Sequence, residues 1–388
     1  MKISVLAPFP KNKDGLPRVA EELIAQFCEA TSVDSVSIIA RQDLGFVSPP
    51  ILAKARVSLF TFRIFLAPWT FLKVIKLYKE GDFFLVFGMP WEMLHPIPAL
   101  YLFTRLIRYH FLPRSKWIQV LPDFIPYVHT EDTGEGQRTL RLYDFFKKHF
   151  IKIPAKYVAI SESTKRDAMR YWGLSADNID VIYLGSFITP KSPRTRFGSG
   201  KIVMVSDIAP RKNHVRLLRA FERVYRDTPT VELIIAGYVR KNVPEFEATL
   251  DEIKKRNEGL RVKLCGYVSD ADVQSLYEEA DVFVYPSLYE GFGLPVLEAM
   301  ACGCPIIASN ISSLPEVVGE AGLLVDPYDV EALAQAISTV LKDDDLKREM
   351  SVKSIAQARR FSWEKAGAEL LAVCREVAEG VSQPKGSN

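Results

Sequence analysis

The sequence predicts an α/β protein of two domains, each built on a parallel β-sheet with helices on its faces. Short apolar runs alternate with helix-length amphipathic segments along most of the chain, which is the pattern of parallel strands joined by crossover helices. The chain has 388 residues, 48% of them hydrophobic, so it can form more than one large core. Prolines and glycines replace the apolar periodicity between 184 and 201, which indicates a linker.

The linker separates two series of elements. In the first series the expected strands and helices cover, in order, strands 3–9, 35–40, 83–88, 117–121 and 157–161, and helices 19–30 and 162–172. In the second they cover strands 201–207, 231–237, 261–266, 281–287, 305–309 and 321–326, and helices 214–226, 245–257, 273–279, 294–302 and 330–341.

The domain assignment follows from these series. We expect a first domain over 1–187, a second over 188–365, and a C-terminal helix within 366–388 that packs back on the first domain and ends in a polar tail. Parallel sheets bind ligands beyond the carboxyl ends of their strands, so we expect the two sheets to face each other across a ligand cleft.

Composition excludes several classes of protein. Lys+Arg 50 against Asp+Glu 47 gives a formal net charge of +3, which argues against nucleic acid as a partner. The 5 cysteines are odd in number, and the close pair Cys302 and Cys304 has the wrong spacing for a zinc or redox motif, so no metal site is expected. The apolar run at the N-terminus is too short for a signal peptide, which favours a cytoplasmic location.

Aromatic and basic residues are mixed in the first half of the chain. Charged residues and prolines interrupt the apolar stretch 83–107, so it does not predict a membrane span. The segments 62–79 and 101–117 combine large apolar side chains with Lys and Arg, and the mean hydropathy is +0.03. Two interpretations stay open: peripheral contact with the cytoplasmic face of a membrane, or core helices with a solvated basic side.

The most informative stretch is YPSLYEGFGLPVLEAMACGCP, which follows an expected strand and leads into a helix starting near Leu294. Gly291 and Gly293 let the backbone approach a ligand, and the free N–H groups of the helix start can bind an anion such as a diphosphate. Glu290 and Glu298 are separated by seven residues. One carboxylate could hold sugar hydroxyls and the other a ribose. The alternative is purely structural: a glycine turn followed by a helix whose early Glu complements the helix dipole.

A second stretch, VMVSDIAPRKNHVRLLRAF, places Arg211 and Lys212 between a strand and a helix, where they can neutralise a diphosphate. An exposed basic turn is the alternative. In the N-terminal loop KNKDGLPRVAEEL, Gly15 could let a backbone N–H reach a phosphate or sugar, and Arg18 could face the cleft. This loop lacks the G-x-G-x-x-G pattern, which disfavours a nicotinamide enzyme.

Together these residues resemble the retaining GT-B glycosyltransferases of family 4, also called glycosyl transferases group 1. The resemblance rests on the Glu, seven residues, Glu motif and on these runs: PRKN, GYVSDADVQSLYEEADVFVYPS, ASNISSLPEVVGEAGLLVDP and FSWEKAG. It covers essentially all of the second half. In the first half it is more diffuse and rests on the opening strand with its glycine loop, on IQVLPDFIP and on the run that begins YVAISESTKRD.

The resemblance implies a GT-B fold, in which two Rossmann-like domains face across a cleft. The first domain would bind the acceptor and the second the nucleotide sugar. Family members need no metal, so no cofactor is expected beside the donor. The resemblance implies catalytic roles for Glu290, Arg211 and Lys212. On the donor side, Glu298 would bind the ribose, Val268 would lie at the base, further contacts would come from Gly15 and Ser206, and the sugar and diphosphate would be held by Glu290, Gly291, Phe292, Gly293 and Leu294. On the acceptor side, contacts would come from Arg18 and Asp123.

Two positions depart from the family pattern. Many members carry a His–Asp pair where this chain has Pro122 and Asp123, so a sugar contact from that histidine is not carried over. His129 lies nearby and is interpreted as a loop residue. Asp207 stands where many members have an arginine, and Arg211 could supply that charge.

The function implied is transfer of a hexosyl group, with retention at the anomeric carbon. The donor would be a nucleotide diphosphate sugar, with GDP-mannose and UDP-hexoses as the leading candidates, and the acceptor a glycan or polyprenyl-diphosphate-linked glycan in lipopolysaccharide or other cell-surface polysaccharide assembly. A silent nucleotide-sugar-binding partner subunit, a nucleotide-sugar epimerase and a phosphorylase are the alternatives. The full family pattern weakens the epimerase alternative. The lack of an obvious cofactor-lysine motif weakens the phosphorylase alternative.

Overall fold

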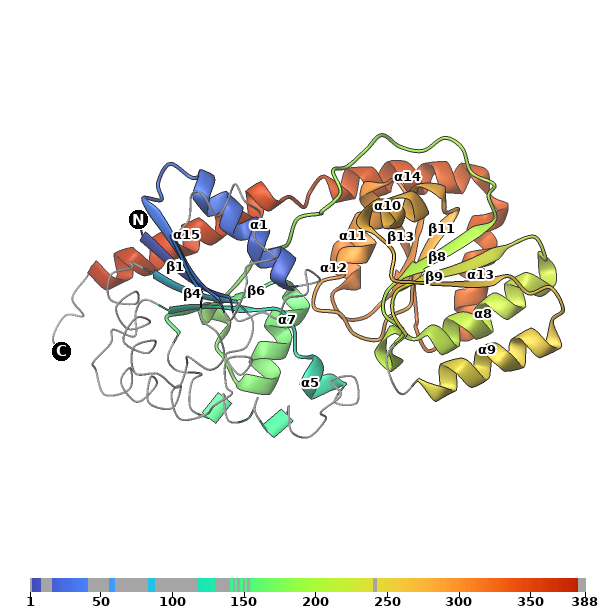
Figure 1. Cartoon of the computed structure of the whole chain (residues 1–388), viewed down its shortest axis with the longest axis horizontal. Helices are drawn as coiled ribbons and strands as arrows, with labels where there is room; N and C mark the ends of the chain where they lie inside the picture. Colours follow the sequence, from blue (N-terminus) through green and yellow to red (C-terminus); the bar gives the residue numbers. More distant parts are fainter. Residues whose placement is uncertain are drawn as a thin grey trace. The chain divides into compact units, whose positions relative to one another are not determined.

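The protein is described by a computed structural model that covers residues 2–7, 16–40, 56–59, 83–87, 117–129, 140–141, 144, 147–148, 151, 154–239 and 243–382 (Figure 1). Internal contacts divide the chain into two compact units. Unit 1 comprises Met1–Tyr127, Gln137–Gly185 and Trp363–Asn388, and unit 2 comprises Val128–Gly136 and Ser186–Ser362.

Unit 1 is built on a parallel sheet whose described strands follow the order β3-β2-β1-β4-β5-β6-β7. The order reverses between β1 and β4, as in other doubly wound sheets. The strands are β1 (Lys2–Ala7), β2 (Ser35–Ala40), β3 (Arg56–Leu59), β4 (Phe83–Phe87), β5 (Trp117–Leu121), β6 (Lys156–Ala159) and β7 (Ile179–Val181). The short strands β3 and β7 at the two ends of the sheet were not expected from the sequence.

The C-terminal helix of the chain packs in unit 1. Figure 1 shows helix α15 (Trp363–Ser382) beside helix α1 (Leu16–Glu29), and the two helices are in contact. Gly367 of α15 permits a close approach, because a Cβ atom there would lie 2.5 Å from Cβ of Gln26. The helix starts at Trp363, earlier than the expected 366.

The segment 162–172, expected to be one regular helix, changes its winding. Helix α7 (Glu162–Asp167) begins at Ser161, whose side chain accepts a hydrogen bond from Thr164 N. It continues as a π-helical turn, η4 (Ala168–Trp172), which ends at Gly173 with a φ of 70°. The wider turn accompanies a buried Trp172 that packs edge-on against Phe124 at 5.0 Å. The short helices α5 (Ile125–Val128) and η5 (Ala176–Asn178) complete the described elements of this part.

Unit 2 contains a second parallel sheet, with the order β10-β9-β8-β11-β12-β13. Its central strands β11 and β12 are buried at every position, which explains their continuous apolar sequence. The outer strands β10 and β13 are partly exposed. The strands are β8 (Lys201–Val205), β9 (Glu232–Ala236), β10 (Val262–Gly266), β11 (Val282–Tyr285), β12 (Ile306–Ser309) and β13 (Gly322–Val325).

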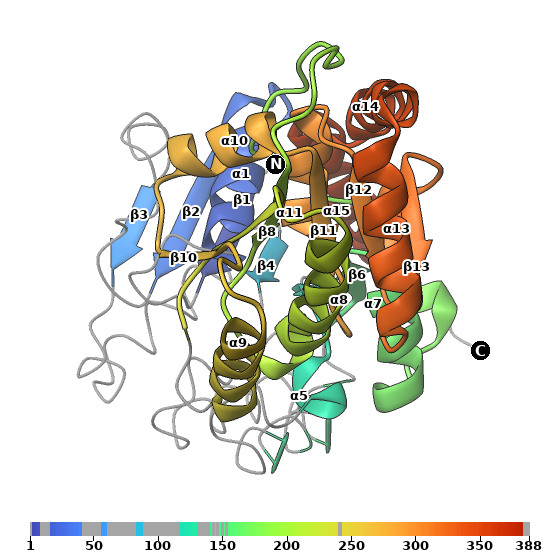
Figure 2. The same ribbon diagram turned by 90° about the vertical axis from the view of Figure 1, so that its right-hand side faces the viewer.

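Helices cover both faces of this sheet. Figure 2 shows α8 between α9 and α13, and both neighbours contact α8. Helices α10, α11 and α12 pack with one another on the opposite face (Figure 1). The helices are η6 (Pro210–Lys212), α8 (His214–Asp227), α9 (Pro244–Arg256), α10 (Asp270–Glu279), α11 (Leu294–Ala301), α12 (Leu314–Val318), α13 (Val330–Lys342) and α14 (Asp344–Ala358).

The segment that enters β8 is tied to unit 2. The carboxylate of Asp281, which is buried, accepts hydrogen bonds from the backbone N–H groups of Gly198 at 2.8 Å and Gly200 at 2.7 Å. The guanidinium of Arg194 donates to the carbonyls of Tyr277 and Ala280, at the end of α10. The Pro- and Gly-rich stretch read as a linker is therefore held by specific bonds.

Several features expected from the sequence lie outside the described residues. These include Gly15 and nearly all of the two aromatic and basic segments 62–79 and 101–117. Within the described ranges, every helix is too short or too polar to span a bilayer.

The contact between α1 and α15 can be tested with a substitution at Gly367. Gly367→Ala should lower the free energy of unfolding, because overpacking costs about 1–3 kcal/mol against a helix-propensity gain of roughly 1 kcal/mol. Gln26→Gly removes the Cβ that the new methyl group would meet. A double-mutant cycle by urea unfolding should give a coupling of at least about 1 kcal/mol. Additive effects would contradict the close approach.

Candidate functional site

The site lies where the strand order of the second sheet reverses. Strands β8 and β11 are neighbours, and the helices that follow them, α8 and α11, cover opposite faces of the sheet. The loops after these strands diverge there, which opens the position at which doubly wound sheets bind ligands. Arg211 and Lys212 follow β8, and Glu290 follows β11, so the topology brings together residues that are far apart in the sequence.

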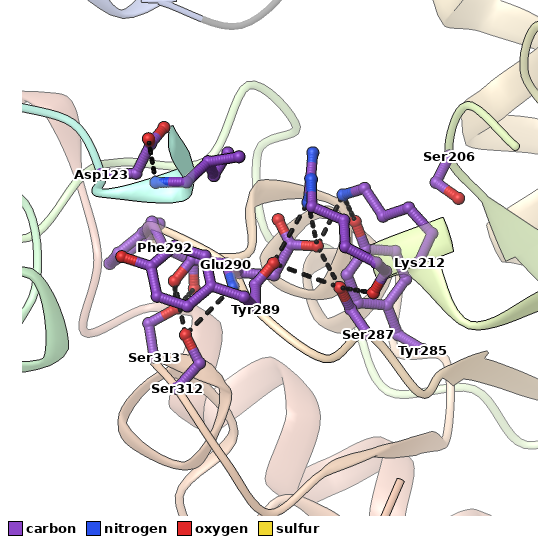
Figure 3. Close-up of polar contacts among 12 residues, drawn as sticks. Asp123, Ser206, Lys212, Tyr285, Ser287, Tyr289, Glu290, Phe292, Ser312 and Ser313 are labelled. Atoms are coloured by element: carbon purple, nitrogen blue, oxygen red, sulfur yellow. Dashed lines mark hydrogen bonds and ion pairs between the residues drawn. The ribbon is translucent and has the colours of Figure 1, made fainter. Parts of the chain in front are cut away.

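Glu290 is the centre of a cluster of hydrogen bonds (Figure 3). Its Oε1 accepts from Arg211 Nη1 at 3.2 Å, from Lys212 Nζ at 2.5 Å and from Ser287 Oγ at 2.6 Å. Lys212 Nζ also donates to the hydroxyl oxygen of Tyr285 at 2.6 Å. Both Lys212 and Glu290 are at least nine-tenths buried. The structure thus brings together the three residues for which the family resemblance implies catalytic roles.

The charges of this cluster perturb one another. Burial, with a smaller contribution from Arg211, lowers the pKa of Lys212 to about 8 against the opposing attraction of Glu290 and Asp207. Burial raises the pKa of Glu290, but the attraction of Lys212 and Arg211 outweighs burial and the pKa is lowered overall. Two cations therefore share the single carboxylate oxygen of Glu290, and the carboxylate of Asp207 adds a weaker attraction for Lys212. Arg211 and Lys212 are the charges of this cluster that could meet an anion.

Two serines fix the backbone of Glu290. Ser312 Oγ accepts a hydrogen bond from Glu290 N at 3.0 Å and lies 2.7 Å from Glu290 O, to which it donates. Ser313 Oγ also contacts Glu290 O, at 3.0 Å, and Phe292 O, at 2.8 Å. Ser312 has a φ of 60°, which is unusual for a residue other than glycine. The loop before α12 therefore determines where Glu290 stands.

The glycine loop leads into α11 with a strained backbone. Gly293 has a φ of 110° at the start of the helix, and a Cβ atom there would lie 2.7 Å from Leu314 Cδ2, so only glycine fits. Gly291 is buried, and Leu294 is half-buried as the first helical residue. The ring of Phe292 packs edge-on against Phe361 at 5.8 Å. Its side chain is therefore part of the core, and the backbone is what it can offer to a ligand.

Glu298 lies within α11 and is half-buried. Its Oε2 accepts a hydrogen bond from the hydroxyl of Tyr277 in α10, at 3.2 Å. Val268, expected near the base, is half-buried between β10 and α10. Both residues belong to the part of unit 2 that follows β10 and β11.

Two residues of the loop after β8 make local contacts. Ser206 Oγ lies 3.2 Å from Nε2 of His214, which is buried at the start of α8. Burial lowers the pKa of His214 to about 3, with a further contribution from Lys212, so this imidazole is neutral at physiological pH. Asp207 Oδ1 accepts from Tyr238 N at 3.3 Å, and Asp207 thus links the loops after β8 and β9.

The acceptor-side residues belong to unit 1. Arg18 is half-buried on α1. Asp123 Oδ1 accepts a hydrogen bond from Ile125 N at 3.0 Å, which closes the turn into α5. The carbonyl of Pro122 lies 3.4 Å from Thr164 Oγ1. The side chain of Asp123 therefore stabilises the turn that leads into α5. Its expected role toward an acceptor stays a prediction.

Four further residues of the site were not singled out from the sequence: Tyr285, Ser287, Ser312 and Ser313. All four stand in runs that carry the family resemblance, but nothing in a single sequence shows that the loop before α12 reaches back to Glu290. Across the described ranges, no group of three or more His, Cys, Asp or Glu could hold a metal ion.

The fold of the chain is that of GT-B glycosyltransferases, as expected. It is similar to Anabaena HepE in complex with UDP and glucose, with a TM-score of 0.71 at 20% identity, over 97% of this chain and 100% of that one. It is also similar to sucrose-phosphate synthase from Thermosynechococcus elongatus, with a TM-score of 0.69 at 20% identity, over 98% and 99% of the two chains.

Sequence comparison identifies the family. Residues 189–360 match the family described as glycosyl transferases group 1. The chain is 35% identical to O-antigen chain mannosyltransferase B of Escherichia coli, over 55% of this chain and 58% of that protein. It is 30% identical to the serotype-specific mannosyltransferase WbdA of Escherichia coli, over 64% of this chain and 32% of that protein. The match spans less than two thirds of either relative. The match over residues 189–360 confirms the resemblance for the second half of the chain.

The serine that holds Glu290 can be tested by its effect on stability. Ser312→Ala and Ser312→Gly both remove the acceptor of the Glu290 N–H, while Glu290 O keeps its bond from Ser313, and the loss should cost about 1–3 kcal/mol of unfolding free energy. Glycine also relieves the positive φ, so Ser312→Gly should be more stable than Ser312→Ala by about 0.5–1 kcal/mol. Urea unfolding measures both. Ser275→Ala, at an exposed serine of α10, is the control and should change little. Equal stability of wild type and Ser312→Ala would contradict this role.

Proposed function

We propose that the chain is a retaining hexosyltransferase that moves a hexosyl group from a nucleotide diphosphate sugar to a hydroxyl group of a glycan. The observation that supports this most directly is the buried cluster of Arg211, Lys212 and Glu290 at the reversal point of the second sheet. The family match and the mannosyltransferase names of the relatives support the reaction class.

The cluster suits the charge changes of the reaction. The bond between the anomeric carbon and the diphosphate oxygen breaks, and negative charge grows on the leaving diphosphate. Arg211, Lys212 and the backbone N–H groups at the start of α11 would oppose that charge in a site that excludes water. The new bond forms between the acceptor oxygen and the anomeric carbon, and the acceptor proton passes to an oxygen of the leaving diphosphate.

Glu290 is arranged to hold the donor sugar as well as the cations. Its contacts with Arg211, Lys212 and Ser287 are all made by Oε1. In our proposal Oε2 accepts hydrogen bonds from sugar hydroxyl groups. Because the cations keep the carboxylate ionised, those bonds would be charge-assisted and stronger than bonds to a neutral acceptor.

We further propose that the reaction proceeds without a metal cofactor. A nucleotide diphosphate sugar carries two negative charges, and in our proposal Arg211 and Lys212, which lie in one short helical turn, would meet them. Lys212 is fixed by Glu290 and Tyr285, so the ammonium group needs little reorganisation when the diphosphate arrives. These side chains would perform the charge neutralisation for which other enzymes use a cation.

The donor and acceptor are proposed from the relatives. The names of the bacterial relatives specify mannosyl transfer and an O-antigen chain, which favours GDP-mannose and a glycan or lipid-linked glycan acceptor in cell-surface polysaccharide assembly. HepE, which shares the fold, was solved with UDP and glucose, so UDP-hexoses are the other candidates. An acceptor on a lipid carrier would bring the chain to the cytoplasmic face of a membrane as a peripheral protein.

The first test is binding and turnover without added metal. One family of nucleotide diphosphates should raise the melting temperature, because a ligand at about 100 times its Kd stabilises the native state by about 2.7 kcal/mol. The matching nucleotide sugar should then be consumed only when a mannose-containing acceptor is present, with retention seen by NMR. Lys212→Ala should lower kcat by about 100-fold or more while the fold is kept. Binding with no transfer would indicate a silent subunit, and no binding would overturn the proposal.

The pKa of Lys212 gives a pH dependence. Its ammonium form, which would hold the diphosphate, is favoured below pH 8 and is lost as the pH rises through that value, since the pKa is lowered to about 8. The affinity for the donor should therefore fall above about pH 8, by up to roughly tenfold per pH unit. Lys212→Arg keeps its charge and should show no such fall. Calorimetric titration checks this, and a flat profile for the wild type would contradict it.

A further inference from the structure

Tyr277 is a buried tyrosine that the proposed reaction does not use. Its side chain is fully buried on α10, yet its hydroxyl donates to Oε2 of Glu298 at 3.2 Å. Phenylalanine would fill the same space without a polar group. A buried hydroxyl is costly unless it is hydrogen-bonded, and this hydroxyl bonds a carboxylate of the candidate donor site. Its role is therefore sought at that carboxylate.

The ring of Tyr277 is fixed by its neighbours. It packs edge-on against Phe283 at 5.3 Å, and Phe283 stacks on Tyr285 at 5.6 Å. Tyr285 in turn holds Lys212. A row of three aromatic side chains thus runs from the partner of Glu298 to the partner of Lys212, inside a close-packed core that leaves little room for rotation.

The backbone of Tyr277 is also held. Arg194 Nη1 donates to the carbonyl of Tyr277 at 3.3 Å and to that of Ala280 at 2.6 Å. These carbonyls lie at the end of α10, where no further helical turn would satisfy them. The backbone N–H of Arg194 donates to Ser351 Oγ at 2.8 Å. Tyr277 therefore offers its hydroxyl from a fixed position.

Burial raises the pKa of Tyr277 well above 10, and the nearby carboxylate of Glu298 raises it further. The phenol is therefore protonated near neutral pH and can donate. Glu298 is half-buried and has three rotatable side-chain bonds, so an unassisted carboxylate would lose conformational entropy when a ligand ordered it.

We propose that Tyr277 is a positioning residue that orients the carboxylate of Glu298 toward the ribose hydroxyl groups of the donor nucleotide. The inference rests on the proposed function, in which Glu298 binds ribose. Tyr277 touches no reacting atom and acts by holding Glu298 in its binding orientation before the donor arrives. The donor site would therefore distinguish ribonucleotides from deoxyribonucleotides through Glu298, and Tyr277 would sharpen that distinction.

The test compares Tyr277→Phe with wild type using nucleoside diphosphates that carry ribose, 2′-deoxyribose or 3′-deoxyribose. Loss of one hydrogen bond to a charged group should weaken binding of the ribonucleotide by about threefold to tenfold. Binding of the deoxynucleotide that lacks the contacted hydroxyl should not change. In turnover, KM for the donor should rise while kcat stays within about twofold, because the contact is the same in ground and transition states.

Two further variants make the result specific. Glu298→Ala removes the acceptor that Tyr277 and the ribose would share, so it should remove the preference for ribose, and adding Tyr277→Phe to it should have no further effect on binding. Tyr225→Phe removes a tyrosine hydroxyl that donates to Glu258 O elsewhere in unit 2, and it should leave all affinities unchanged. Circular dichroism and melting temperature verify that each variant is folded.

The outcomes separate this inference from the proposed function. Equal weakening of all nucleotides in Tyr277→Phe would mean a purely structural role and would overturn the inference, as would unchanged ribonucleotide binding. Either result leaves the proposed function intact when the wild type binds nucleotide. If the wild type binds no nucleotide at all, the proposed function and the inference fall together.

Discussion

The candidate site depends on a single carboxylate oxygen. Oε1 of Glu290 accepts hydrogen bonds from two cations of the loop after β8 and from a serine of its own loop. That oxygen joins two loops that leave the same edge of the sheet and lead to helices on its opposite faces, α8 and α11, so it fixes the two loops relative to each other. Ser312 and Ser313 add the loop before α12 to the same point. Three loops of the second sheet therefore meet at Glu290.

This arrangement is better explained by ligand binding than by stability. Taking a lysine and a glutamate out of water costs several kcal/mol per ion, and a buried ion pair often gives less stability than apolar residues of similar volume. Here burial lowers the pKa of Lys212 to about 8 although Glu290 and Asp207 oppose the shift. The proposed function accounts for this cost, because it uses the buried ammonium group to bind the diphosphate.

Much of the second unit could be predicted from its sequence, because its central strands are continuous apolar runs and its site residues sit in one motif. Helix α14 could not be predicted in this way. Its buried side includes Lys347, Ser351 and Ser354, so polar residues lie where an amphipathic pattern would place apolar ones. Ser354 donates to the carbonyl of Cys304 and Lys347 to that of Leu341, contacts that only the folded chain defines. The short strands β3 and β7 carry too few residues for a period-two pattern.

The same limit applies to the site. A spacing of seven residues between Glu290 and Glu298 is visible in the sequence, but the two carboxylates have different surroundings. Glu290 is held by cations and is ionised by them, whereas Glu298 receives the hydroxyl of Tyr277, whose ring belongs to the core. The sequence motif identifies the two glutamates, but their tertiary contacts determine what each of them can bind. In the proposed function both carboxylates accept hydrogen bonds from neutral hydroxyl groups, Glu290 from the sugar and Glu298 from the ribose. Arg211 and Lys212, which contact Glu290, would meet the charged diphosphate between them.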